Sequence, residues 1–140
     1  MTPVLLHDGP YLRILWDENL RIIGIDWKET TATMVSEEFK ADLTLFATYV
    51  EKKKAPGILV DVTGFRHKMD PEVKKWRVKN ISTRYSAAGV RKFAFLFPKG
   101  AQIPPMMNQS ASEETFQTRA FDDIQQAEDW LTGDSSRQNR

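Results

Sequence analysis

The sequence predicts an α/β fold, a mixed and roughly five-stranded sheet with helices packed on it. Two neighbouring segments carry this prediction. Residues 58–62 form a nearly unbroken apolar run rich in β-branched side chains, which is typical of a strand covered on both faces. Asp70-Pro71-Glu72 has the composition of a helix start, with a capping carboxylate, a proline at the first helical position and an acid in the first turn. In open α/β sheets such a strand-to-helix turn usually lies at the working surface.

The first part of the chain predicts a β-hairpin and then a helix. Residues 12–16 and 20–27 alternate in polarity on either side of a short polar turn, which is the pattern of a hairpin. Ser36, followed by two glutamates, predicts a helix start, and Pro56 forbids continuation at the other end. Apolar residues at helical spacing form one stripe between them. They are Phe39, Leu43, Phe46 and Val50.

The second part predicts two further strands and two further helices. A helix is expected over residues 71–88, strands over 92–97 and 116–121, and a final helix capped by Asp122. The element order is therefore β-β-α-β-α-β-(α)-β-α, and strands that alternate with helices favour parallel pairing. The bracketed helix is expected near residues 105–112, because two parallel strands need a crossover connection.

Length and composition favour a single domain over residues 1–140, with an ordered core at about 10–132 and a polar tail at 133–140. The net charge of +1 argues against a general polyanion binder. Cysteine is absent, which excludes disulfides and thiolate metal sites. No secretory signal pattern opens the chain, and no apolar stretch approaches the roughly 18 residues of a membrane span. A cytoplasmic protein is expected.

Two motifs carry a resemblance to a known family. One is Val60-Asp-Val-Thr63, which leads through Arg66 to Asp70 and a helix. The other is Thr118-Arg-Ala-Phe-Asp-Asp-Ile-Gln-Gln-Ala-Glu-Asp-Trp-Leu131, similar to an arginine-x-phenylalanine strand and a closing alanine-x-x-tryptophan-leucine helix. In these motifs the chain resembles the SpoIIAA-like group within the STAS domains. The resemblance covers about residues 10–132. It implies a mixed sheet flanked by helices on one side, an outline shared with CRAL-TRIO lipid-binding domains.

One position departs from that family's pattern. Regulatory members carry a phosphorylatable serine directly after an aspartate at the start of this helix. Here Asp70 is followed by Pro71, which has no hydroxyl, and Ser82 and Thr83 lie well inside the predicted helix. A kinase-driven partner switch is therefore not expected at this position. The resemblance still implies that the protein binds protein partners, as members of this family do.

Chemistry-bearing residues cluster around the end of the strand at 58–62. A carboxylate and an imidazole, Asp61 and His67, could do acid–base work if they lay close together. The favoured alternative is that Asp61 and Thr63 bind backbone groups in the turn while Asp70 caps a helix. The chain has two histidines and no nucleotide fingerprint. We therefore expect no metal, no cofactor and no enzymatic activity.

Charge is distributed unevenly along the chain. Residues 66–92 carry nine basic side chains against two acids, whereas residues 101–131 carry six acids against one arginine. Such polarity can steer an acidic partner or an anionic membrane surface toward the second helix, and it could equally favour head-to-tail self-association. A merely solvated helix face is the favoured alternative. Aromatic side chains are not interleaved with the basic ones, so nucleic-acid binding is not expected. The candidate binding loop and helix surface comprises Thr63, Arg66, His67, Asp70, Lys75, Trp76 and Lys79.

Two apolar features stand out on this background. Trp76 falls beside the expected buried arc of its helix, so it either anchors an interface or tucks over the helix edge onto the sheet. The segment 103–107 combines prolines with apolar side chains, which favours an adaptable surface patch. Its candidate residues are Ile103, Met106 and Met107, and the alternative is that they plug the edge of the sheet.

These observations favour a non-enzymatic binding or regulatory module that makes protein–protein contacts through the second helix and the loop before it. The partner is an unidentified protein or a second copy of the chain, with a homodimer as one such form. A carrier of a small apolar or lipid-like ligand, as the CRAL-TRIO relation would imply, is the second hypothesis. A small enzyme that uses Asp61 and His67 is the third.

Overall fold

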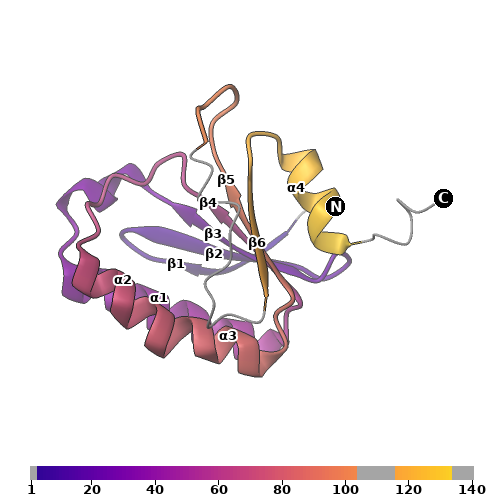
Figure 1. The fold of residues 1–140 in the computed structure, drawn as a ribbon, viewed down its shortest axis with the longest axis horizontal. Coiled ribbons are helices and arrows are strands. Elements are labelled where there is room, and N and C mark those ends of the chain that lie inside the picture. Colours follow the sequence, from indigo (N-terminus) through magenta and orange to yellow (C-terminus); the bar gives the residue numbers. More distant parts are fainter. Residues whose placement is uncertain (1–2, 104–115, 134–140) are drawn as a thin grey trace.

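Six strands form one mixed sheet, and they lie side by side in the order of the sequence (Figure 1). The three strands nearest the amino terminus pair antiparallel, and each pair from the third strand to the sixth is parallel. The computed structural model describes residues 3–103 and 116–133. The strands are β1 (Val4–Asp8), β2 (Leu12–Asp17), β3 (Ile22–Trp27), β4 (Gly57–Asp61), β5 (Lys92–Leu96) and β6 (Gln117–Phe121).

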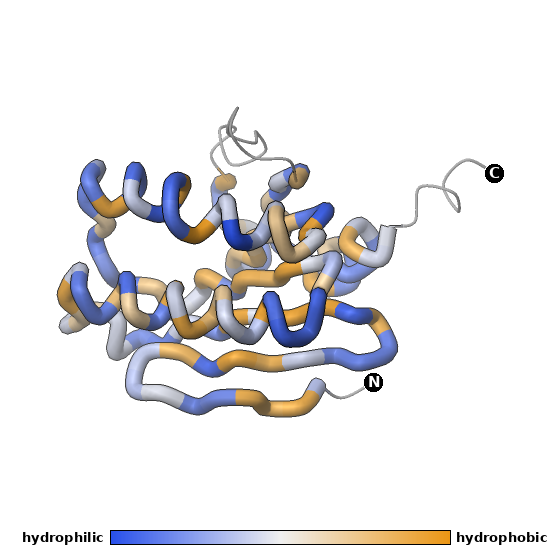
Figure 2. Tube along the Cα trace, turned by 90° about the horizontal axis from the view of Figure 1, so that it is seen from below, coloured by the Kyte–Doolittle hydropathy of each residue, from blue (hydrophilic) through white to orange (hydrophobic). Residues whose placement is uncertain are grey.

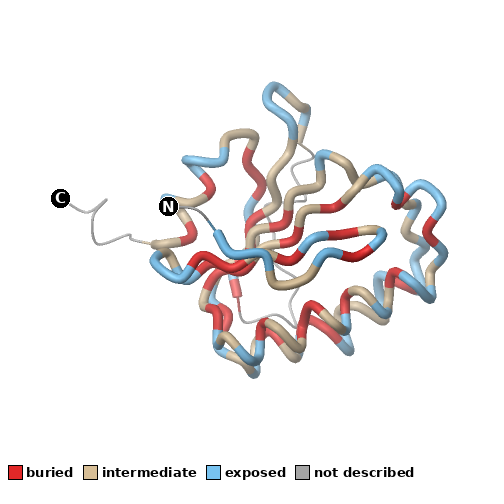
Figure 3. Tube along the Cα trace, turned by 180° about the vertical axis from the view of Figure 1, so that it is seen from behind, coloured by how far each residue is buried: buried red, intermediate tan, exposed pale blue. Residues whose placement is uncertain are grey.

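The predicted α/β class and the mixed sheet are confirmed, but the sheet has six strands rather than about five. The additional strand is β1, which begins before the expected core at residue 10. It lies at an edge of the sheet, where Val4 and Leu5 are 57% and 50% exposed (Figure 3). An edge strand whose side chains are mostly exposed carries little of the alternating pattern by which strands are recognised. The helix expected near residues 105–112 lies outside the described residues.

One face of the sheet is covered by two long helical segments that lie side by side (Figure 2). The first is α1 (Ser36–Lys53), which follows the short 3-10 helix η1 (Glu29–Thr33). The second is continuous over the predicted 71–88 and consists of α2 (Pro71–Arg77), a π-helical turn η2 (Val78–Ser82) and α3 (Thr83–Ala88).

The π-helical turn changes which residues of the second helix face the sheet. Val73, Ile81 and Tyr85 are buried, whereas Val78 is half-buried. A π turn inserts one extra residue per turn and so shifts the phase of everything after it. The helical periodicity of the sequence does not reveal that shift.

The last helix, α4 (Ile124–Thr132), packs on the opposite face of the sheet from the others (Figure 1). Adjacent strand residues point to opposite faces. Accordingly Phe93 belongs to the main core, whereas Ala94 packs with Ala127 and Leu131 of α4. The expectation of helices on one side is therefore wrong. Ile124, at the start of α4, is 53% exposed.

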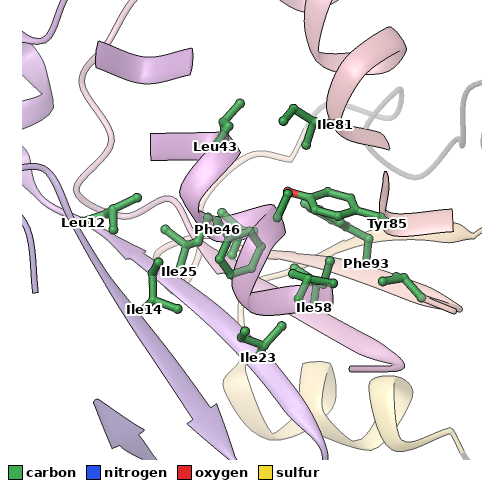
Figure 4. Packing of buried hydrophobic residues seen from close by; sticks show 14 of the residues in the cluster. Leu12, Ile14, Ile23, Ile25, Leu43, Phe46, Ile58, Ile81, Tyr85 and Phe93 are labelled. Atoms are coloured by element: carbon green, nitrogen blue, oxygen red, sulfur yellow. The ribbon is translucent and has the colours of Figure 1, made fainter. Parts of the chain in front are cut away.

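The main core lies between the sheet and helices α1 and α3 (Figure 4). All four residues of the apolar stripe predicted for α1 are buried, which confirms it. Phe46 from that stripe is fully buried and its ring meets that of Tyr85 edge-on at a centroid distance of 6.1 Å. This core holds the first strands, both helical segments and the loop after β4 together.

Two predicted helix caps are each displaced by one residue. Val35, rather than Ser36, is the N-cap of α1, and its N–H donates to the Glu38 carboxylate at 3.0 Å. Asp123, rather than Asp122, caps α4 and accepts from the Gln126 N–H at 3.1 Å. Asp122 and Asp123 are equally good capping residues, so the backbone conformation decides between them. Valine is a poor capping residue, and Val35 takes the N-cap position through its extended backbone, without a side-chain capping bond.

Candidate functional site

The ends of the parallel strands β3, β4 and β5 meet at one edge of the sheet, here called the carboxyl edge. Asp26, Asp61 and Leu96 are direct neighbours across these strands. The loops at 28–35 and 62–70 begin there and lead into α1 and α2. β4 is an interior strand and delivers the chain to a helix that starts at Pro71, as predicted.

The loop at 62–70 is anchored to the loop at 28–35. The Thr31 hydroxyl is buried, accepts from the Arg66 backbone N–H at 2.7 Å and donates to the Lys28 carbonyl at 2.7 Å. Gly64 sits so close to the other loop that a Cβ there would lie 2.5 Å from the carbonyl oxygen of Trp27. The platform before α2 is therefore fixed by a hydrogen-bonded hydroxyl and by close backbone packing.

Several candidate residues make the turn and cap contacts that the sequence favoured. The Thr63 N–H donates to Asp61 Oδ1 at 2.9 Å, and the Arg66 guanidinium donates to the Thr63 carbonyl at 2.9 Å. Asp70 caps α2 by accepting from the Val73 N–H at 2.9 Å. These groups shape the backbone of the loop.

The structure does not bring Asp61 and His67 together. Asp61 follows Leu59 onto the face of the sheet where α4 packs. The His67 ring lies against Phe39 of α1 on the other face, at a centroid distance of 5.3 Å. His67 Nε2 is buried there and has no hydrogen-bond partner among the described residues.

The exposed side of helix α2 carries the basic residues that the sequence singled out. Lys75 and Lys79 are exposed, whereas Trp76 is half-buried and packs against the core. The Lys40 ammonium of α1 lies 5.5 Å from the centroid of the Trp76 ring. Trp76 therefore bridges the seam between α1 and α2, which corresponds to the tucked alternative more closely than to a free anchor.

Ion pairing divides the basic residues of the second helix into two groups. Arg84 binds Glu51 of α1 through two contacts of 2.8 and 2.6 Å, and this arginine lowers the pKa of the Glu51 carboxyl. Over the described part of the chain, five neighbouring cations have no carboxylate within ion-pair distance. These five, here called the α2 surface, are Lys68, Lys74, Lys75, Arg77 and Lys79.

The predicted apolar patch is only partly described. Ile103 is half-buried and follows a turn whose Gly100 N–H donates to the Asp122 carboxylate at 3.1 Å, next to the start of α4. This turn is therefore bound to the segment between β6 and α4 and not to α2. Met106 and Met107 lie outside the described residues.

A pair of carboxylates at the carboxyl edge was missed by sequence reasoning. Asp26 and Asp61 are neighbours on adjacent strands, and Arg13 approaches Asp26 to 3.8 Å. Burial and then the charge of Asp61 raise the pKa of Asp26, against the attraction of Arg13 and Lys28. Only the parallel register places the two carboxylates side by side, and no local pattern encodes that register.

Replacing Asp26 with asparagine is expected to stabilise the protein slightly at pH 7. A carboxyl whose pKa is raised by folding contributes stability below its unfolded pKa and loses it as pH rises through the folded pKa. The gain of Asp26→Asn should therefore be present at pH 7 and absent at pH 3. Denaturant unfolding of both proteins at the two pH values measures it, and an equal gain at both would contradict the assignment.

Within residues 3–103 and 116–133, no three histidine, cysteine or acidic side chains converge as a metal ion would require. None of the helices described combines the length and the apolar character needed to cross a bilayer.

The fold and this edge define a class: an α/β domain with a mixed six-stranded sheet, a rigid loop after β4 and a basic helix beside it. Comparison with known proteins goes no further, because no family model, no curated protein and no solved structure matches the chain. The resemblance to the SpoIIAA-like group stays a prediction from two sequence motifs.

Proposed function

We propose that this protein is a non-enzymatic binding module that contacts an acidic segment of a partner protein through the α2 surface. The observation that supports the proposal is that the basic residues in and next to the second helix differ in ion pairing. Arg84 is neutralised by Glu51, while the five cations of the α2 surface have no carboxylate partner in the described chain. Unpaired charges of one sign steer an oppositely charged partner and fix its orientation.

The loop before α2 supports the same proposal because it is already ordered. Thr31 and the close approach of Gly64 hold it, and Asp70 caps the helix that follows. A surface fixed before binding loses little conformational entropy when a partner docks. The proposed contact thus combines electrostatic attraction with a rigid platform.

The decisive variant is the charge reversal Lys75→Glu with Lys79→Glu, since both side chains are exposed and folding should be unaffected. Proteins captured at low salt from the native cell are purified, cross-linked to the chain and titrated against each variant. The double reversal is expected to weaken binding at least about tenfold, with the loss shrinking as salt screens the charges. Cross-links from the α2 surface should reach an acidic segment of the partner.

The matched control is Lys52→Glu with Lys54→Glu, which changes the net charge equally at the far end of α1. It should bind as the wild type does. Equal binding by all three proteins would overturn the proposal. Binding that disappears on nuclease treatment would do the same and would point to nucleic acid.

A further inference from the structure

A charged cleft lies at the end of the sheet opposite the carboxyl edge. It has a volume of about 660 Å³ and is bounded by the turn between β2 and β3, the residues that precede β4 and β5, and helix α4. Sites for small molecules commonly enclose ~300–1,000 Å³ and present a few converging polar groups. The charged residues that line it are Arg21, Arg91, Lys92, Glu128 and Asp129.

The wall formed by the sheet is basic, and two of its cations are held in place. Lys92 Nζ donates to the backbone carbonyl of Trp130 at 2.9 Å and lies 5.2 Å from the centroid of the Trp130 indole ring. The Arg21 guanidinium donates to the last carbonyls of α1, at 3.1 Å to Lys53. Arg91 is exposed, and its side chain has no hydrogen bond or ion pair in the described chain.

The wall formed by α4 is acidic. Asp129 accepts from the Gln125 side chain at 3.1 Å, and Glu128 is half-buried. Burial first, and then the charges of Asp17 and Asp129, raise the pKa of Glu128. Neither acid comes within 4.0 Å of a cation of the opposite wall among the residues described.

Opposite charges therefore line one cleft, and no ion pair joins its two walls among the residues described. We propose that this cleft binds a small zwitterion of short-peptide size, with its carboxylate on Arg91 and Lys92 and its ammonium group on Glu128 and Asp129. A ligand that carries both charges supplies the missing partner to each wall, whereas a singly charged one leaves a wall uncompensated. The site is independent of the α2 surface, so it adds an activity to the proposed function.

The probe is trialanine, because only its two ends are charged. Isotope-labelled full-length protein is titrated at pH 7 with trialanine, with its N-acetylated form and with its C-terminal amide, and amide shifts are followed by NMR. Trialanine should give saturable shifts at Arg91, Lys92 and residues 125–133. Each blocked form should bind at least about tenfold more weakly, because one wall then lacks its partner.

Single substitutions test whether the peptide binds in the cleft. Arg91→Gln and Glu128→Gln should each weaken trialanine binding about tenfold, whereas Lys75→Gln, an equal loss of one charge on the α2 surface, should leave it unchanged. The absence of saturable shifts in the cleft would overturn the inference. Equal affinity for the three forms of the peptide, or equal loss in the control variant, would overturn it as well.

Discussion

Replacing Phe46 with alanine is expected to lower the free energy of unfolding by about 3–5 kcal/mol, the range for a fully buried aromatic residue. Phe46 is inaccessible to solvent, and its ring lies between α1, the sheet and Tyr85 of α3 (Figure 4). Its removal forfeits apolar burial and leaves a cavity that close-packed neighbours fill only in part. Denaturant unfolding followed by circular dichroism measures the loss.

A control for this prediction lies just before the same helix. Val35 is 57% exposed, so Val35→Ala should change stability by no more than about 0.5 kcal/mol. A loss below about 1 kcal/mol for Phe46→Ala would show that the core does not close around this ring as the structure has it.

Replacing Gly64 with alanine is expected to cost about 1–3 kcal/mol and to detach the loop before α2. The added Cβ would lie 2.5 Å from the Trp27 carbonyl oxygen and 3.3 Å from the Glu29 nitrogen. Both obstacles are backbone atoms, so the clash is relieved only if one loop moves. Movement of the loop would break the bond from the Arg66 N–H to the Thr31 hydroxyl.

Hydrogen exchange at the Arg66 amide, together with unfolding, distinguishes this outcome from general destabilisation. Exchange should accelerate in Gly64→Ala more than in the core strands. The neighbouring change Thr63→Ala removes an exposed side chain that makes no hydrogen bond in the described structure, and it should alter neither measurement appreciably. Unchanged protection of Arg66 in Gly64→Ala would contradict the close packing of the two loops.

The candidate site was predictable from the sequence wherever its residues act locally. The Asp61 and Asp70 carboxylates accept from backbone N–H groups two and three residues further along the chain, and such contacts follow from residue type and spacing. The bond expected from the Thr63 side chain is not among the hydrogen bonds of the described residues. Asp61 ends strand β4, and His67 follows six positions later in a loop that has no fixed period. Their placement on opposite faces therefore had to come from the structure.

Contacts between distant segments were not predictable in the same way. The basic run after β4 is visible in the sequence. The ion pair that neutralises Arg84 with Glu51, however, depends on how α1 lies beside α3. The pairing of Asp26 with Asp61 depends on strand register, and the two walls of the cleft meet only because α4 crosses to the second face. Single-sequence patterns describe one element at a time, and these features belong to two or more.

By itself, the sequence determined the α/β class, the five strands from β2 to β6, the stripe of α1 and the helix that begins at Pro71. Each of these follows from hydrophobic period and capping chemistry within one segment. Only the tertiary structure decided that β1 completes the sheet, that α4 lies on the other face and which charges remain unpaired. Edge pairing, face selection and ion pairing are settled by the burial and charge of segments far apart in the chain, so only the folded protein determines them.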